Sequence, residues 1–188
     1  MSTPERPTIL LITGSVRVGR RYPQIAEWVL SLAERSGRLA CEIVDLREWH
    51  LPSGDEPGIP AKNAHAHCHT RAWSAKVAGA DGFVIVSSRY NWGYPAPLKN
   101  ALDHLYKEWT GTLVIVTYGG HRGGKCAEQL RQVAGGLKLQ PVDTMPAITV
   151  AREAIENDSP QSLEDLKPFE ATVEQALDEL SAVLADAG

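Results

Sequence analysis

Short apolar runs rich in valine and isoleucine recur along the chain. They are nearly continuous rather than alternating with polar residues, which is typical of strands buried on both faces of a parallel sheet. The predicted strands are 8–13, 40–45, 82–87, 112–117 and about 147–150.

Between these strands, apolar residues are spaced three and four apart, which predicts helices. Pro23 and Gly37 bracket the first helix, and Pro95 and Gly111 bracket the third, because proline suits a first turn and glycine the position after a last turn. Further helices are predicted around 65–77, over about 124–137, and from Pro168 onward. Strand and helix alternate five times, which predicts one α/β domain over residues 1–188, with a parallel sheet covered by helices on both faces.

Composition narrows the class of protein. The chain has 188 residues, 43% of them hydrophobic, which suits a single core. No apolar run approaches the roughly 18 residues of a membrane span, and the N-terminal MSTPERP lacks the apolar centre of a signal peptide. Three cysteines without CxxC spacing fit a reducing compartment, so we expect a cytoplasmic protein. A net charge of −4 makes nucleic acid an unexpected partner.

Ligands of such sheets bind at the carboxyl ends of the strands. Three loops leave those ends, at 14–22, 87–95 and 117–124. A fourth irregular stretch, 46–60, is long enough to line a site, and a solvated connection is the equal alternative.

The stretch GSVRVGRRYPQ (14–24) follows the first strand and opens the first helix. A helix N-terminus, a serine hydroxyl and arginine guanidiniums together favour a phosphate. A Walker A loop is excluded because Arg20-Arg21 stand where Lys-Ser/Thr is required, and a dinucleotide fingerprint is disfavoured because Val16 replaces its middle glycine. A single terminal phosphate remains, with a solvated surface turn as the alternative.

The other two loops suit a flat ring. YNWGY (90–94) alternates aromatic and small residues, and TYGGHRGGK (117–125) has four glycines that let the backbone approach a ligand closely. With GSVRVGR, LPSGDEP, ADGFVIVSSRYNWGYPAPLKNALDHL and YGGHRGGKCAEQLRQV in this order, the chain resembles the NADPH-dependent FMN reductases, which include flavin, quinone, azo-dye and chromate reductases.

The resemblance implies a flavodoxin-like three-layer α/β/α sandwich, with a five-stranded parallel sheet of order 2-1-3-4-5. It implies FMN as cofactor, NADPH or NADH as co-substrate, a small-molecule electron acceptor, and a homodimer or a tetramer built from dimers. Carried over position by position, it assigns the phosphate to Ser15, Arg17 and Arg20, helped by Tyr22 and Gln24. It assigns the isoalloxazine border to Tyr90, Asn91, Trp92 and Gly93, and the pyrimidine side to Tyr118, Gly119 and Gly120.

No catalytic acid–base pair is found, and hydride transfer from a nicotinamide to a flavin needs none, so no catalytic residue is predicted. We expect a ping-pong cycle in which NAD(P)H and an oxidised acceptor use the same place in turn. Two rival functions share the fold: a flavodoxin-type electron carrier and a flavin-binding regulatory protein without turnover. Arg89, His121 and Arg122 lie on the loops 87–95 and 117–124. They could bind the phosphates of a nicotinamide nucleotide, and plain surface charge is the equal alternative.

Three other features have competing interpretations. The tract HAHCH (65–69) has histidines one helical turn apart beside Cys68, as in metal sites, but His65 and His69 share a helix stripe with Trp73, so packing is preferred and no metal ligand is assigned. Cys126 suits a small buried residue better than a reactive thiolate. Leu105, Tyr106 and Trp109, near the end of the third helix, are predicted to form a dimer interface.

Overall fold

A computed structural model describes residues 6–18, 22–62, 65–120, 123–157, 159 and 161–186. Its strands form one parallel sheet of order β2-β1-β3-β4-β5, in which β6 also pairs with β4. The strands are β1 (Thr8–Thr13), β2 (Ala40–Asp45), β3 (Gly82–Ser88), β4 (Gly111–Gly119), β5 (Leu139–Pro141) and β6 (Ala147–Thr149). The order that the resemblance implied is confirmed, and the only change is that two short strands share the fifth position.

The fifth position is divided because β5 and β6 pair with opposite ends of β4. Strand β5 pairs with Gly111–Leu113, and β6 pairs with Thr117–Gly119. The segment between them stays attached through two further bonds, in which Val142 N donates to Leu113 O and Thr117 N donates to Pro146 O. A three-residue strand such as β5 is too short to show a periodic pattern, which is why the sequence does not reveal it.

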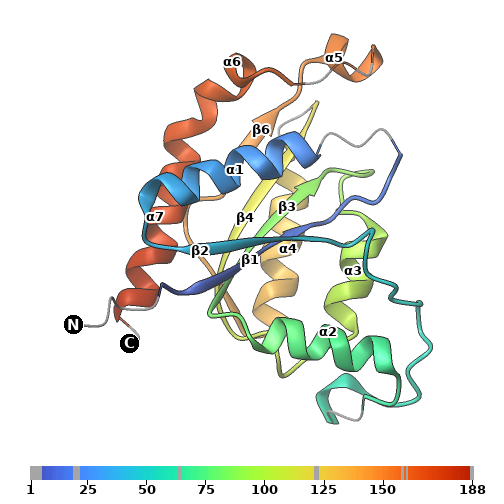
Figure 1. Cartoon of the computed structure of the whole chain (residues 1–188). Coiled ribbons are helices and arrows are strands. Elements are labelled where there is room, and N and C mark those ends of the chain that lie inside the picture. The colour runs from blue at the N-terminus through green and yellow to red at the C-terminus, as the bar shows by residue number, and fades with distance from the viewer. Residues whose placement is uncertain are drawn as a thin grey trace.

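Helices cover both faces of the sheet (Figure 1). One face carries α1 (Tyr22–Ser36) and α7 (Glu170–Asp186), and the other carries α2 (Cys68–Ala78), α3 (Ala96–Asp103) and α4 (Gly124–Gly136). Shorter pieces are the 3-10 turns Pro60–Lys62 and Lys167–Phe169, and the helices α5 (Arg152–Glu156) and α6 (Leu163–Leu166). Among the described residues, no helix is both long and apolar enough to cross a membrane.

Alternate residues of the central strands build two cores. In β1, Ile9 and Leu11 pack toward α1 and α7, whereas Leu10 and Ile12 pack toward α2, α3 and α4. All four are at most 2% exposed. Full burial of such a side chain stabilises the fold by about 1.5–3 kcal/mol, so the continuous apolar runs of the sequence fix the sheet at the centre of the molecule.

Helix α3 ends earlier than the sequence predicts. Leu105 and Trp109 continue its helical spacing, but the indole Nε1 of Trp109 donates to Leu102 O, at 3.0 Å, and Tyr106 N donates to the Glu108 carboxylate, at 3.3 Å. These bonds use backbone groups that another helical turn would need. Leu105 and Trp109 are each 1% exposed within the single chain, so the prediction that these two contribute to a dimer interface is wrong. Tyr106 is half-buried, and its place in an interface stays a prediction.

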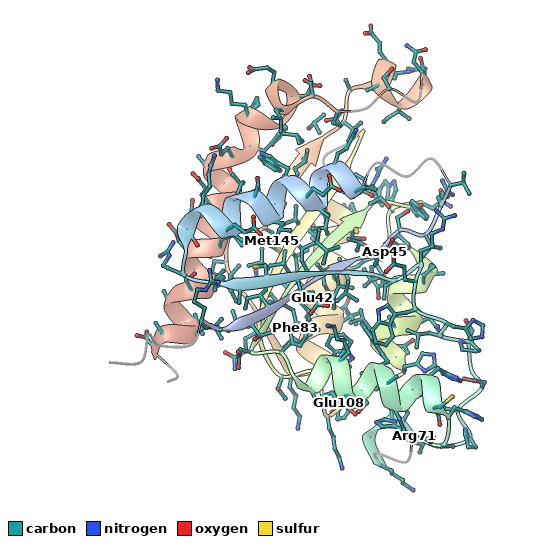
Figure 2. The ribbon with its side chains drawn as sticks, viewed as in Figure 1. Glu42, Asp45, Arg71, Phe83, Glu108 and Met145 are labelled. Atoms are coloured by element: carbon teal, nitrogen blue, oxygen red, sulfur yellow. The ribbon has the colours of Figure 1, made fainter. Side chains whose placement is uncertain are left out.

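Helix α2 begins at Cys68, so the predicted helical stripe through His65 is also wrong at its start. The Glu56 carboxylate accepts hydrogen bonds from the backbone of Ala66 and His67. Arg71 donates to the carbonyls of His65 and Ala66. Figure 2 shows Arg71 on α2. Because side chains bind these backbone groups, the segment before Cys68 is extended rather than helical.

Candidate functional site

Buried hydroxyl residues gather where β1, β3 and β4 end. They are Thr13, Ser15, Ser87, Ser88 and Thr117, each at most 8% exposed. Polar side chains at the ends of otherwise aliphatic strands form a floor that can donate and accept hydrogen bonds. We call this region, with residues 14–18, 89–95, 119–120 and Gly123 around it, the carboxyl edge. Four of these hydroxyl residues, Thr13, Ser87, Ser88 and Thr117, are not among the predicted site residues, although their position at the ends of the apolar runs is a usable signal.

The loops after β1 and β3 meet at Tyr90. The Ser15 hydroxyl lies 2.6 Å from the Tyr90 hydroxyl, and the Arg17 guanidinium lies over the Tyr90 ring, 4.1 Å from its centroid. An exposed cation over an aromatic face contributes about 0.5–1 kcal/mol. Two predicted phosphate residues and one predicted ring residue are therefore in direct contact.

Residues 90–93 form a tight two-residue turn. Tyr90 and Gly93 exchange both backbone hydrogen bonds at 2.9 Å, while Asn91 and Trp92 have φ of 46° and 73°. Positive φ is uncommon for asparagine and a clear outlier for a bulky residue such as tryptophan. Trp92 is also 63% exposed, so burial of its ring does not offset this strain. Strain of this kind concentrates at functional sites.

Two glycines fix how closely the neighbouring segments approach. A Cβ on Gly14 would lie 3.0 Å from the Leu98 side chain and 3.1 Å from Ser87 Oγ. Gly123 has φ of 73°, and a Cβ there would lie 2.7 Å from Thr117. Any larger residue at Gly123 would push α4 away from the end of β4. These contacts hold the loops against the floor.

The other predicted site residues are placed less directly. The amide oxygen of Gln24 accepts from Gln161 N, at 3.0 Å, so its side chain has only the NH₂ group left to offer a phosphate. The Tyr118 side chain is 5% exposed and packs in the core, which leaves its backbone for the predicted pyrimidine contact. Gly119 and Gly120 follow it on the carboxyl edge. Arg20, His121, Arg122 and the side chain of Tyr22 lie outside the described residues.

A buried thiol and a half-buried phenol near the site stay protonated at neutral pH. Burial raises the pKa of the Cys126 thiol to about 11, although a hydrogen bond with Ser87 opposes the shift. Burial likewise raises the pKa of Tyr94 to about 12. The interpretation of Cys126 as a small buried residue is confirmed, since it is fully buried.

The donors of the carboxyl edge fit FMN. Ser88 Oγ is buried and has no hydrogen-bond partner among the described residues, so the floor has hydrogen-bonding capacity that a ligand can use. Guanidinium and hydroxyl groups suit a phosphate, and exposed backbone in the turn 90–93 suits the heteroatoms of a ring. The pocket of about 390 Å³ at the opposite end of the sheet, lined by residues of β4, β5 and α7, contains none of the predicted site residues.

Comparison with known proteins settles the family. Residues 7–153 match the family described as NADPH-dependent FMN reductase. The chain belongs to this family. It is therefore an oxidoreductase with FMN as cofactor and a nicotinamide nucleotide as co-substrate, which decides against a pure electron carrier.

Individual relatives agree with this membership. The chain is 52% identical over 163 residues to the NAD(P)H-dependent FMN reductase C4B3.06c of Schizosaccharomyces pombe, covering 82% of each protein. It is 28% identical over 138 residues to a quinone reductase of Escherichia coli, covering 69% of this chain and 70% of the other. The solved structure of FerB, a flavoenzyme NAD(P)H:(acceptor) oxidoreductase of Paracoccus denitrificans, superposes with a TM-score of 0.72 at 18% identity, covering 94% and 98% of the chains. This last likeness supports the fold.

Proposed function

We propose that this FMN reductase passes reducing equivalents from NAD(P)H to a quinone, free flavin, azo compound or similar acceptor in a ping-pong cycle. The observation that carries the proposal is the meeting of the loops after β1 and β3 at Ser15, Arg17 and Tyr90, in a chain of this family. The quinone reductase of Escherichia coli supports the class of acceptor.

Each part of the carboxyl edge has one task in this proposal. Bound FMN supplies the hydride chemistry, so the chain itself has to hold and orient it. Arg17 and Arg20 bind the phosphate, with Ser15 donating a hydroxyl hydrogen bond. The turn 90–93 presents the backbone N–H groups of Asn91 and Trp92 to the ring, because those of Tyr90 and Gly93 close the turn itself.

The rim of the site is open. Arg17, Asn91 and Trp92 are exposed, so water can reach the reacting face and supply the protons that an acceptor takes up. No buried acid is required for that step. The exposed indole of Trp92 provides an apolar surface for a flat acceptor, which favours quinones and flavins over small polar oxidants.

Replacing the two arginines separates the proposed phosphate contacts from the ring contacts. In Arg17→Ala/Arg20→Ala, we expect FMN affinity to fall by more than about 100-fold, since each of the two lost charge-assisted hydrogen bonds contributes about 1.5–3 kcal/mol. Riboflavin, which has no phosphate, should bind nearly unchanged. Arg38→Ala is the matched control, because Arg38 is an exposed arginine paired with Asp178 on α7. Equal losses of FMN and riboflavin would show that these arginines do not form a phosphate clamp.

Steady-state kinetics test the cycle. Initial-velocity lines for NAD(P)H at several concentrations of a quinone should be parallel, because the two substrates never occupy the site together. Intersecting lines would require both substrates to be bound at once. Bound flavin without NAD(P)H consumption would instead support a regulatory protein.

A homodimer and a cytoplasmic location are also part of the proposal. The observed burial of Leu105 and Trp109 moves any subunit contact away from those residues. Light scattering of the FMN-loaded protein measures the oligomeric state, and a monomer would contradict the dimer.

A further inference from the structure

Three potential metal ligands converge at one corner of the molecule, away from the predicted phosphate and ring contacts. They are Asp55 from the loop between β2 and α2, His69 from the first turn of α2, and His104 at the end of α3. Their donor atoms all lie within 4.8 Å of one another. We call this region the histidine corner, and it includes the rest of the loop 46–60, the segment before α2 and residues 104–109. In Figure 1 the loop runs past α3 to reach α2.

Two of these side chains are close together without satisfying each other. His69 Nε2 lies 3.0 Å from Asp55 Oδ2. Nevertheless, His69 Nε2 and Asp55 Oδ1 are buried atoms without a hydrogen-bond partner in the part of the chain that the structure describes. The short distance combined with an unmade hydrogen bond means that the ring nitrogen is not aimed at the carboxylate oxygen. His69 Nε2 and Asp55 Oδ1 therefore both have hydrogen-bonding or ligating capacity that a bound ion could use.

The third ligand, His104, is held by its other ring nitrogen. His104 Nε2 lies 3.1 Å from Pro52 O, and because a carbonyl can only accept, Nε2 carries the proton. Metal-binding histidines commonly donate their second N–H to a carbonyl in this way, which fixes the tautomer and the ring orientation. His104 is 6% exposed, so its ring has little freedom to turn.

The remaining nitrogen of His104 has a lone pair available. Its Nδ1 lies 3.3 Å from the Thr70 hydroxyl, which is long for a hydrogen bond from an O–H donor. A cation that binds this lone pair therefore replaces a weak contact rather than a strong hydrogen bond.

The loop that carries Asp55 is held in register for this contact. Asn100 Nδ2 donates to Leu51 O, at 2.7 Å, and His67 Nε2 donates to Asp55 O, at 3.0 Å. These bonds attach both sides of the loop to helix α3 and to the start of α2. The ligands are thus fixed before any ion arrives, which reduces the entropy lost on binding.

We infer that Asp55, His69 and His104 form a binding site for a divalent transition-metal ion of the zinc class. Two imidazoles and one carboxylate suit Zn²⁺ and its neighbours rather than Mg²⁺ or Ca²⁺, which prefer oxygen ligands alone. The fourth position is open to water, as in many zinc sites that hold three protein ligands. The ion cross-links the loop 46–60 to α2 and α3. This role is independent of the proposed acceptor and of the flavin site.

This site differs from the local tract that the sequence suggested. His65 is engaged elsewhere, since its Nε2 lies 2.7 Å from Glu108 Oε1 and both side chains are at most 9% exposed. Cys68 is exposed and is absent from the cluster. Of the tract, only His69 contributes a ligand, and its partners come from distant parts of the chain.

Zinc titration of the FMN-loaded, tag-free protein after chelator treatment tests the site. With a coloured chelator as competitor, we expect one Zn²⁺ bound per chain. Asp55→Asn and His69→Gln should each weaken binding by about 100-fold, at the upper end of the loss seen when a group that merely supports a ligand is removed. Both residues are partly exposed, so these variants should fold, and retention of the FMN absorption band verifies it.

Cys68→Ser is the matched control, because Cys68 is next to His69 but outside the cluster. It should bind Zn²⁺ like the wild type and show the same rise in Tm on adding zinc, whereas Asp55→Asn and His69→Gln should show none. Loss of zinc in Cys68→Ser, with retention in Asp55→Asn, would assign the metal to the local tract and overturn this site. If the wild type bound Zn²⁺ no more tightly than the Asp55→Asn/His69→Gln double variant, these residues would be an ordinary histidine–carboxylate contact. That result would also overturn the proposed site.

Discussion

The carboxyl edge and the histidine corner are organised by different means. At the carboxyl edge the backbone determines the shape: Gly123 allows α4 to lie against β4, and the turn 90–93 is closed by its own N–H and C=O groups. At the histidine corner side chains determine the shape, because Glu56, Asn100 and His104 bind the backbone of the loop and of the segment before α2. The carboxyl edge should therefore be sensitive to added side-chain atoms, and the histidine corner to changes in charge.

The largest effect should follow a substitution that adds one methyl group to the carboxyl edge. Gly123→Ala places a Cβ 2.7 Å from Thr117 at a φ of 73°. We expect the free energy of unfolding to fall by about 3 kcal/mol, from left-handed backbone strain and overpacking together. Denaturant unfolding measures it.

Gly124→Ala is the control for this prediction, because nothing lies within 4 Å of a Cβ there. Alanine within the helix should leave the protein unchanged or slightly more stable. Equal losses for the two glycines would break the argument that the backbone fixes the carboxyl edge by close contact.

A charge change should dominate at the histidine corner. The Glu108 carboxylate, which lies beside α2 in Figure 2, accepts from Ser74 Oγ at 2.6 Å and pairs with His65. Burial alone would raise the pKa of Glu108, but the hydrogen bonds from Ser74 and His65 outweigh it, so the pKa lies below its usual 4.5. Glu108→Gln should lower the free energy of unfolding at pH 7 by about 2 kcal/mol, since hydrogen bonds to charged groups are the strong ones.

The same carboxylate makes the corner sensitive to acid. Because the pKa of Glu108 is lower in the folded state, its contribution is fully present above pH 4.5 and is lost as the pH falls through the folded value. The stability difference between wild type and Glu108→Gln should therefore shrink as the pH falls below 4.5. Glu48→Gln, which replaces an exposed carboxylate in the loop 46–60, is the control and should change the free energy of unfolding little. A constant difference across this range would contradict the assignment.

A smaller effect of opposite sign is expected at the floor of the carboxyl edge. Ser88→Ala removes a buried hydroxyl for which the described residues provide no partner, so the FMN-free protein should gain up to about 1 kcal/mol. Ser87→Ala removes a hydroxyl that donates to Ser88 O and should lose a similar amount. Thermal unfolding of the two FMN-free variants measures the contrast, and a loss in both would show that Ser88 is satisfied in the absence of ligand.

The smallest effect should come from the strained turn. Trp92→Asn places asparagine, which tolerates positive φ, at a position where φ is 73°. It should stabilise the protein by about 0.5 kcal/mol and, by removing the indole, weaken the binding of flat acceptors. Lys138→Asn, at a φ of 65° after α4, should gain as much stability without altering acceptor KM. If both substitutions changed the acceptor KM, the change could not be attributed to loss of the Trp92 indole.

The sequence predicted most of the fold because the central strands are buried on both faces. Runs such as 82–87 have no other stable place in an α/β protein, so the layers follow, whereas the order of the strands was implied by the family resemblance. It failed where a single side chain redirects the backbone. The indole of Trp109 ends α3 by bonding Leu102 O, although its spacing continues the helix, and the Glu56 carboxylate delays the start of α2.

The candidate site was likewise predictable from the sequence only in part. The loops of the carboxyl edge were identified from their position after strands, and Ser15, Arg17 and Tyr90 are brought together as that position requires. The predicted roles of Gln24, Tyr118, Gly119 and Gly120 stay predictions. Asp55 and His104 could not be recognised as partners, because nothing in a local spacing connects a loop residue to the end of a helix 49 positions away.

The divided fifth strand bears on how the protein behaves when crowded. A long, straight edge strand would present a row of unpaired N–H and C=O groups, and strands of other molecules could pair with them. Here the edge consists of the three-residue strands β5 and β6. Pro141 is the last residue of β5, and Pro146 precedes β6. Prolines have no N–H to donate, so an incoming strand finds no continuous ladder. The interruption therefore protects the molecule from aggregation through this side of its sheet.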